Sequence, residues 1–175
     1  ISTYTDKIKA IFNYAVKNRL ITYNPVLVKL KRNKADKTAL TATELNTLLS
    51  KLKDFGYKQY ISCLLAGKCG MRQGEICGLT WDCIYPDHIE VNKQWKNIDG
   101  TGKNGFGTLK TQNSKRNIPI NNKIYSDLME YKKSLGYIDI NNRILDYKTT
   151  ASFSFTIRKI IKNIGFDISI HELRH

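Results

Sequence analysis

Arginine is scarce in this sequence of 175 residues, because seven of its 29 basic residues are arginine and the other 22 are lysine. Acidic residues are also few, and the formal net charge is +14. No apolar run approaches the roughly 18 residues that a membrane span needs, and no signal peptide opens the chain. These absences argue against a membrane-spanning or secreted protein and predict a cytoplasmic one.

Cysteine pairs of the kind that bind zinc are missing as well. The four cysteines lie within 21 residues, but their separations of six, eight and six positions form no Cys-x-x-Cys pair. They are Cys63, Cys69, Cys77 and Cys83. We therefore predict buried free thiols in a reducing compartment, with metal binding as the minor alternative.

The excess of positive charge predicts a polyanionic partner. Nucleic acid is the first candidate, and an acidic membrane surface is the second. A compositional alternative stays open, because a chain encoded by an AT-rich genome uses Lys, Ile and Asn heavily for reasons unrelated to binding.

The first 37 residues differ in composition from the rest. Apolar residues recur every three or four positions up to about residue 22 and predict an amphipathic helix that ends near Tyr-Asn-Pro at residues 23–25. Residues 1–37 carry nine basic and two acidic side chains, a net charge of +7. We interpret residues 1–28 as the end of a helical domain whose beginning is missing, and residues 29–39 as a basic linker.

A second domain begins at residue 40 with a helix start signal. In Leu-Thr-Ala-Thr-Glu-Leu, residues 40–45, the Thr and Glu predict a capping box and the two leucines a hydrophobic staple. This helix is expected to reach about residue 53, and a second helix to cover residues 57–68. Gly70 then breaks the pattern immediately before Arg72, and a short helix is expected over residues 75–79.

The remaining pattern predicts an α+β fold, mostly helical with a small three-stranded antiparallel sheet. Its strands are expected at residues 88–96, 108–111 and 117–120, with a Gly-rich loop at 99–107. The last three helices are expected at residues 123–135, at residues 152–164 and from residue 169 or 170 onward.

Arg72 and Arg174 need an explanation in a chain that otherwise uses lysine. A guanidinium grips two oxygens of one phosphate and keeps its charge, which suits a site that stabilises a phosphoryl group. His171 lies three positions before Arg174, so on a helix the two share a face and can serve the same phosphate. Lys110 is the candidate acid for a departing oxygen.

Each of these residues also has a purely structural alternative. Arg72 could pair with Glu75, His171 and Arg174 could close a helix end, and Lys110 is one of 22 lysines. In combination they favour chemistry on a phosphodiester, which needs charge stabilisation at the nonbridging oxygens and a proton for the leaving group.

Residues 40–175 resemble the tyrosine recombinase (phage integrase) family in several ordered segments. Residues 69–81, Cys-Gly-Met-Arg-Gln-Gly-Glu-Ile-Cys-Gly-Leu-Thr-Trp, are similar to the segment around the family's first catalytic arginine. Residues 110–119, Lys-Thr-Gln-Asn-Ser-Lys-Arg-Asn-Ile-Pro, are similar to its sheet-lysine segment, and His-Glu-Leu-Arg-His at residues 171–175 is similar to its His-x-x-Arg motif. The family's opening Leu-Thr-x-x-Glu is matched at residues 40–44.

Two features depart from the family pattern. Cys69 stands where threonine is usual, which we expect to affect packing more than chemistry. The family's nucleophile is a tyrosine downstream of the His-x-x-Arg motif, and none of the ten tyrosines occupies that position. We therefore expect the nucleophile outside these residues, as in an interior piece of an integrase.

The resemblance implies a recombinase that cuts and rejoins DNA through a 3′-phosphotyrosine link, without a metal or nucleotide cofactor. Arg72 and Arg174 would hold the scissile phosphate, Lys110 would protonate the 5′-oxygen, and His171 would assist proton transfer. Residues 40–175 would be the catalytic domain, following the end of a core-binding domain. Further contacts with DNA are expected from Lys31, Arg32, Lys34, Lys103, Lys115 and Arg116.

The implied partners are double-stranded DNA and further copies of the protein, as a tetramer on two duplexes. We favour a mobile-element integrase, of a phage or a transposon, over a chromosomal recombinase. Two alternatives remain: a non-catalytic DNA-binding relative, and a basic RNA-binding module, which the absence of RNA-binding sequence motifs disfavours.

Overall fold

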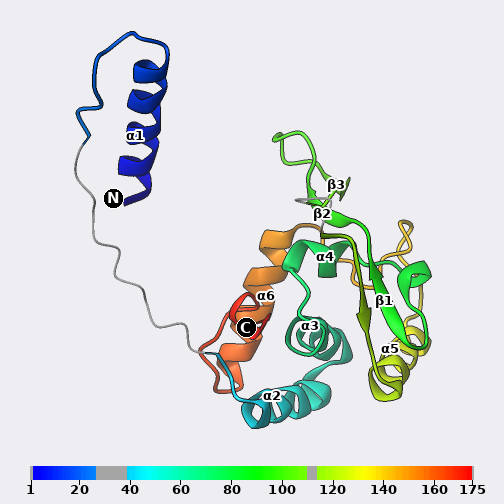
Figure 1. Ribbon diagram of the computed structural model, residues 1–175. Coiled ribbons are helices and arrows are strands. Elements are labelled where there is room, and N and C mark those ends of the chain that lie inside the picture. Colours follow the sequence, from blue (N-terminus) through cyan, green and yellow to red (C-terminus); the bar gives the residue numbers. More distant parts are fainter. Residues whose placement is uncertain (1, 27–38, 110–113, 175) are drawn as a thin grey trace. The chain divides into compact units, whose positions relative to one another are not determined.

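The computed structural model describes residues 2–26, 39–109 and 114–174 (Figure 1). Its contacts divide the chain into two compact units, Ile1–Lys37 and Thr38–His175, which we call unit 1 and unit 2. Of the helices in the described residues, none has the length and apolar character needed to cross a membrane.

Unit 1 contains helix α1 (Ser2–Lys17), which is shorter than the sequence pattern suggests. The helix ends early because Arg19 adopts a left-handed conformation, with φ of 56°, which turns the chain away from the helix axis. The side chain of Asn24 then donates a hydrogen bond of 3.1 Å to the carbonyl oxygen of Lys9, so the following residues fold back along α1. Four large apolar side chains of the helix remain exposed: Tyr4, Ile8, Ile11 and Tyr14.

Unit 2 begins with the predicted capping box. The hydroxyl of Thr41 accepts from the backbone amide of Glu44 at 3.3 Å, and the Glu44 carboxylate accepts from the amide of Thr41 at 2.8 Å. These two bonds satisfy amides that the first helical turn leaves without partners. They start α2 (Ala42–Phe55), which is followed by α3 (Tyr57–Gly67).

Three later helices of unit 2 lie within two residues of their expected positions: α4 (Gln73–Gly78), α5 (Asn122–Ser134) and α6 (Thr150–Asn163). Unit 2 also contains the 3₁₀ helix η1 (Trp81–Cys83), which the sequence pattern does not predict, and the 3₁₀ helix η3 (Glu172–Arg174). The last element is thus a 3₁₀ turn among the described residues, in place of the α-helix that the sequence predicts from residue 169 or 170.

The strands confirm the α+β class but pair differently from the expected single sheet. In the described residues, β1 (His88–Val91) pairs antiparallel with β4 (Arg116–Pro119), and β2 (Gln94–Asn97) pairs antiparallel with β3 (Asn104–Gly107). Two two-stranded sheets therefore replace one of three strands. The strand expected at residues 108–111 is not found at 108–109, and residues 110–111 lie outside the described residues.

Strand β3 occupies the stretch for which the sequence predicts a Gly-rich loop. Its Phe106 lies opposite Trp95 of β2, and the two rings meet edge to face with centroids 5.2 Å apart. This aromatic pair favours strand pairing across a turn in which Gly100 and Gly102 supply positive φ angles.

Helix α3 forms the centre of unit 2. Ile61 and Leu65 are fully buried, and α3 contacts α2, α4, α5, α6 and η3 around it (Figure 1). The C-terminal end of this central helix leads directly into the Gly70–Arg72 segment. The fold therefore fixes the backbone from which Arg72 projects.

Candidate active site

In the turn between α3 and α4, Met71 points into the core and Arg72 points toward the surface. Gly70 has a φ of 61°, a left-handed conformation that glycine adopts without steric cost. Met71 follows with only 1% of its surface exposed, and its amide donates to the carbonyl oxygen of Leu65 at 3.2 Å. Because Met71 is anchored in the core, the next residue, Arg72, is directed outward, and its side chain is 47% exposed.

Glu75 binds the outward-directed Arg72. Its carboxylate is 2% exposed and accepts two hydrogen bonds from Arg72, one from the backbone amide at 2.9 Å and one from Nη1 at 2.9 Å. The structural pairing that the sequence left open is therefore present. It does not use the whole guanidinium, because Nε and Nη2 of Arg72 have no hydrogen-bond acceptor among the residues described.

Arg116 of β4 binds the same carboxylate from the other side. Its Nη1 lies 3.2 Å from Oε1 of Glu75, its Nη2 lies 2.9 Å from Oε2, and Nη1 also donates to the carbonyl oxygen of Ser114 at 3.2 Å. Burial would raise the pKa of Glu75, but the hydrogen bonds from Arg116 and Arg72 outweigh it and lower that pKa. Glu75 is therefore a buried carboxylate that stays ionised between two arginines.

Arg174 joins this group from η3. A capping pair holds the turn before it, since the carboxylate of Glu172 accepts from the amide of Ser169 at 2.8 Å and from its hydroxyl at 2.6 Å. Nε of Arg174 donates to the carbonyl oxygen of Gly70 at 2.8 Å. Burial and the nearby positive charge of Arg72 lower the pKa of Arg174, with Glu75 opposing the shift.

Three guanidinium groups and one carboxylate thus form what we call the arginine cluster: Arg72, Arg116, Arg174 and Glu75. Three positive charges and one negative charge leave the arginine cluster net positive. A site with surplus positive charge and unused guanidinium donors can hold a dianionic or monoanionic phosphate group in a bidentate manner.

The other expected site residues are distributed more widely. His171 is exposed in the turn just before η3, instead of sharing an α-helical face with Arg174. Lys103, in the turn between β2 and β3, and Lys115, immediately before β4, are both exposed. The four other expected residues lie outside the described part of the chain: Lys31, Arg32, Lys34 and Lys110.

Sequence reasoning missed Arg143, a buried arginine that links α4 to β2 and to residues 139–147. Its guanidinium stacks on the ring of Trp95 at 3.9 Å and donates to Asp139 at 2.9 Å and to the carbonyl oxygen of Tyr147 at 2.8 Å. It also lies 3.4 Å from the carbonyl oxygen of Cys77 in α4. The only available signal was its identity, an arginine in a chain that prefers lysine.

The cysteines offer no second site. All four are buried and free, in agreement with the expected thiols, and burial raises the pKa of Cys63 to about 12. Within residues 2–26, 39–109 and 114–174 no group of three or more His, Cys, Asp or Glu side chains is arranged to hold a metal ion.

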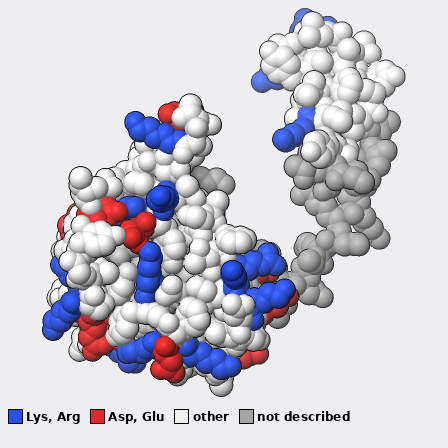
Figure 2. Space-filling model, turned by 180° about the vertical axis from the view of Figure 1, so that it is seen from behind, with Lys and Arg blue, Asp and Glu red and all other residues white. Residues whose placement is uncertain are grey.

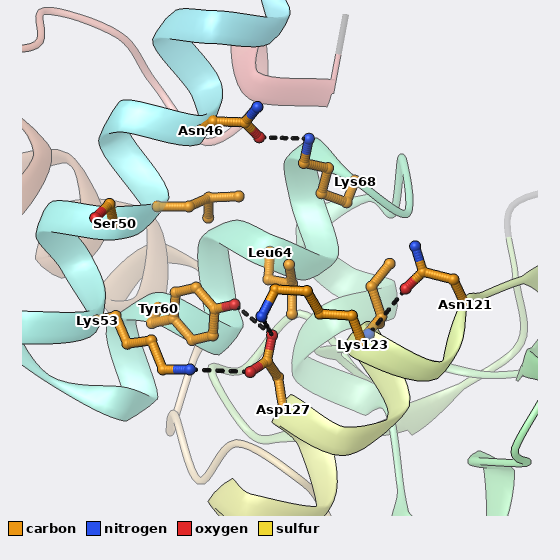
Figure 3. A pocket seen from close by; sticks show the side chains of 11 residues that line it. Asn46, Ser50, Lys53, Tyr60, Leu64, Lys68, Asn121, Lys123 and Asp127 are labelled. Atoms are coloured by element: carbon orange, nitrogen blue, oxygen red, sulfur yellow. Dashed lines mark hydrogen bonds and ion pairs between the residues drawn. The ribbon is translucent and has the colours of Figure 1, made fainter.

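A cavity of about 460 Å³ lies between α2, α3 and α5, away from the arginine cluster (Figure 3). On its wall the buried Asp127 accepts from Tyr60 at 2.6 Å and from Lys53 at 3.1 Å. Leu49, Leu64 and Ile124 supply apolar lining. The cavity is lined by none of the residues proposed for phosphate chemistry, so we place the candidate site at the arginine cluster.

Surface charge is mixed elsewhere on unit 2. On the face seen in Figure 2, lysine and arginine side chains are interspersed with aspartate and glutamate. Half of the net charge of +14 belongs to residues 1–37, so unit 2 carries the other +7, of which the arginine cluster contributes +2.

Comparison with known families adds to this geometry. The family model described as "Phage integrase family" matches residues 38–175, which is most of the chain. The chain belongs to the phage integrase family. The matched residues coincide with unit 2 and contain the whole arginine cluster.

Individual relatives agree with this family assignment. A protein of Caldanaerobacter subterraneus subsp. tengcongensis named "Tyrosine recombinase XerC-like" is 28% identical over 207 residues, an alignment that covers all of this chain and 53% of that protein. The chain therefore spans about half the length of the curated relative that it matches.

Solved structures of two integrases share the fold. The integrase of transposon Tn1549, in complex with transposon right end DNA, matches with a TM-score of 0.77 and 22% identity over 98% of this chain and 62% of that chain. A lambda integrase dimer bound to a COC′ core site matches with a TM-score of 0.67 and 20% identity over 99% and 49% of the two chains.

Proposed function

We propose that this integrase-family chain carries the phosphate-binding residues of a site-specific DNA recombinase, an enzyme that cuts and rejoins DNA strands. The observation that carries the proposal is the hydrogen bond from Arg174 to the backbone of Gly70, which brings the second predicted arginine beside the first. Two guanidinium groups from distant parts of the chain then lie near each other, and together they can bind the oxygens of one phosphate.

The proposed cleavage step assigns each predicted residue one task. A tyrosine hydroxyl attacks the scissile phosphorus, the bond to the 5′-oxygen breaks, and a 3′-phosphotyrosine link and a free 5′-hydroxyl result. Arg72 and Arg174 neutralise the charge that grows on the nonbridging oxygens. Lys110 gives its proton to the departing 5′-oxygen, and His171 assists by taking up the proton that the tyrosine hydroxyl releases.

We infer that none of the buried tyrosines of unit 2 is the attacking residue. The buried tyrosines of unit 2 are poorly suited to attack, because burial raises the pKa of Tyr147 to about 12 and also raises the pKa values of Tyr60 and Tyr131. Their hydroxyls favour the protonated form, and the side chains are enclosed by core residues.

The proposed partner is duplex DNA in the cytoplasm, with DNA contacts expected from residues of each unit. The structural relatives support this partner, since one is a transposon integrase in complex with transposon DNA and another is a lambda integrase tetramer bound to a Holliday junction. By analogy we propose a tetramer on two duplexes and a role in the movement of a phage or transposon.

A suicide substrate tests the proposal. A duplex nicked close to the cleavage point loses its short 5′-hydroxyl fragment after cleavage, so the intact recombinase stays covalently attached and migrates more slowly in a denaturing gel. Retarded binding in a native gel without covalent product would instead support a non-catalytic DNA-binding relative. Preference for single-stranded RNA over the duplex would support a basic RNA-binding module.

A further inference from the structure

The third arginine of the cluster, Arg116, raises a separate question, because its guanidinium binds a buried carboxylate of the same cluster. The sequence predicts that Arg116 contacts DNA, but both of its Nη atoms lie on the oxygens of Glu75, at 3.2 Å and 2.9 Å. Its side chain is 30% exposed, less than the 47% of Arg72. A guanidinium whose terminal nitrogens already serve a buried carboxylate has little left to offer a phosphate.

The hydrogen bonds at Glu75 are distributed evenly. Oε1 accepts from Nη1 of Arg72 and from Nη1 of Arg116, and Oε2 accepts from the backbone amide of Arg72 and from Nη2 of Arg116. A carboxylate has about four acceptor positions, so Glu75 is saturated. Each carboxylate oxygen accepts one hydrogen bond from Arg72 and one from Arg116.

The hydrogen bonds from Arg116 limit how many bonds the guanidinium of Arg72 can make with Glu75. An isolated arginine beside a carboxylate favours the two-pronged geometry in which two guanidinium nitrogens bind two oxygens. Arg116 already occupies one position on each oxygen, so the guanidinium of Arg72 is left with a single bond through Nη1. The pairing with Glu75 therefore orients Arg72 without consuming its remaining donors.

Because two arginines share the carboxylate of Glu75, the group they form keeps a net positive charge. Arg72 with Glu75 alone would form a neutral pair with little attraction for a phosphate. With Arg116 present, two guanidiniums share one carboxylate and a positive charge remains next to Arg174. Arg116 is itself held in place by β4, where it lies opposite Val91 of β1, and by its bond to the carbonyl oxygen of Ser114.

We propose that Arg116 is a positioning residue: by bridging both oxygens of Glu75 it keeps Arg72 singly bound, oriented and charged for the scissile phosphate. This proposal rests on the proposed recombinase function. Arg116 acts through Glu75 and Arg72 and does not touch the DNA.

The test compares Arg116→Gln and Arg116→Lys in the intact protein. Arg116→Gln should slow single-turnover cleavage of the nicked duplex about 10- to 100-fold, because Arg72 is no longer held in the productive geometry. Arg116→Lys keeps the charge but lacks the fork, so the reduction should be intermediate and the fold retained. Lys133→Gln, an equal charge change on the exposed end of α5, should leave the rate unchanged.

Salt dependence separates positioning from DNA binding. A variant that neutralises one phosphate fewer should have a slope of log affinity against log salt that is shallower by about 0.9. Arg116→Gln should leave this slope unchanged, whereas Lys115→Gln, a change at the exposed neighbour proposed to bind DNA, should reduce it. A reduced slope for Arg116→Gln, or an unchanged cleavage rate, would overturn the proposal.

A double-mutant cycle tests whether the effect passes through Glu75. If Arg116 acts by way of Glu75, adding Arg116→Gln to Glu75→Gln should slow cleavage by less than about threefold beyond Glu75→Gln alone. Fully multiplicative reductions would mean that Arg116 acts independently, against the proposal.

A measurement on the protein without DNA tests the positioning role of Arg116 separately from the proposed recombinase function. The chain has seven arginines, so their Nε signals can be resolved by NMR, and relaxation of the Arg72 Nε reports the order of its side chain. Arg116→Gln frees one acceptor position on each oxygen of Glu75, so Arg72 should bind that carboxylate through two nitrogens and its Nε should become more ordered, while the order of Arg143 stays unchanged. If the wild-type protein forms no covalent adduct, the proposed function fails; unchanged order at Arg72 would overturn the positioning role.

Discussion

Arg174 donates a hydrogen bond from Nε to the carbonyl oxygen of Gly70, a residue 104 positions earlier in the chain. Gly70 is the residue with left-handed φ that ends the α3 segment, so the bond ties η3 to the turn that directs Arg72 outward. It uses only one of the donors of Arg174. Its two Nη groups have no hydrogen-bond acceptor within the described part of the chain and can serve a phosphate.

Arg174→Ala should reduce DNA cleavage by about 10²-fold or more, because it removes a donor aimed at charge that develops in the transition state. DNA affinity should fall far less, since the other proposed DNA contacts remain. Single-turnover cleavage and fluorescence anisotropy measure the two quantities. Equal reductions in both would identify Arg174 as a docking residue instead.

Glu75→Gln should destabilise unit 2 by about 3 kcal/mol at neutral pH, because two guanidiniums lose a buried ionised partner. The folded-state pKa of Glu75 is lowered, so its contribution to stability is complete above the unfolded-state pKa of about 4.3 and is lost as the pH falls through the folded-state value.

Urea unfolding at neutral pH and at acidic pH checks this dependence. The difference in unfolding free energy between the wild type and Glu75→Gln should shrink as the pH drops below about 4.3. Glu90→Gln, which removes a carboxylate outside the arginine cluster, is the control. A difference that grows in acid would contradict the expected direction.

Gly78→Ala should destabilise unit 2 by about 1–3 kcal/mol through overpacking. A Cβ atom at residue 78 would lie 2.6 Å from the backbone nitrogen of Trp95 and 2.7 Å from the carbonyl carbon of Gln94, so α4 would have to move away from β2. Gly136→Ala is the matched control, because no atom lies within 4 Å of a Cβ built there. Equal urea midpoints for the two variants would show that α4 tolerates the shift.

Neutralising Lys31, Arg32 and Lys34 should reduce the salt slope of DNA binding by about 0.9 for every phosphate that these side chains neutralise in the wild type. The expectation follows from the net charge of +7 on residues 1–37, half of the total. Anisotropy titrations over a range of salt concentrations measure the slope. An unchanged slope would remove these residues from the DNA interface.

Features with local causes could be predicted from the sequence. The box between Thr41 and Glu44 depends on two side chains three positions apart, and it forms as expected. The ends of α3 and α5 likewise fall within one residue of their predicted positions. The matches around Arg72 and Arg174 led to the family because each is a short continuous motif.

Features that depend on distant partners could not be predicted. Arg116 lies 41 positions from Glu75, and no local pattern shows that β4 brings its guanidinium to that carboxylate. The glycines of β3 carry no periodicity and favour a loop, while the pairing of this strand depends on the ring of Trp95 meeting Phe106. The 3₁₀ turn at η3 follows from the Ser169–Glu172 pair rather than from helical periodicity.

The residues of the arginine cluster are added to the growing chain at different times during synthesis. A ribosome that adds about 5–20 residues per second makes Arg72 and Glu75 almost together, and Arg174 only about 5–20 seconds later. Until Arg116 and Arg174 have been added, Arg72 has Glu75 as its nearby countercharge, and the nascent chain carries a neutral pair. The arginine cluster therefore reaches its surplus positive charge only when these late segments fold onto the early ones.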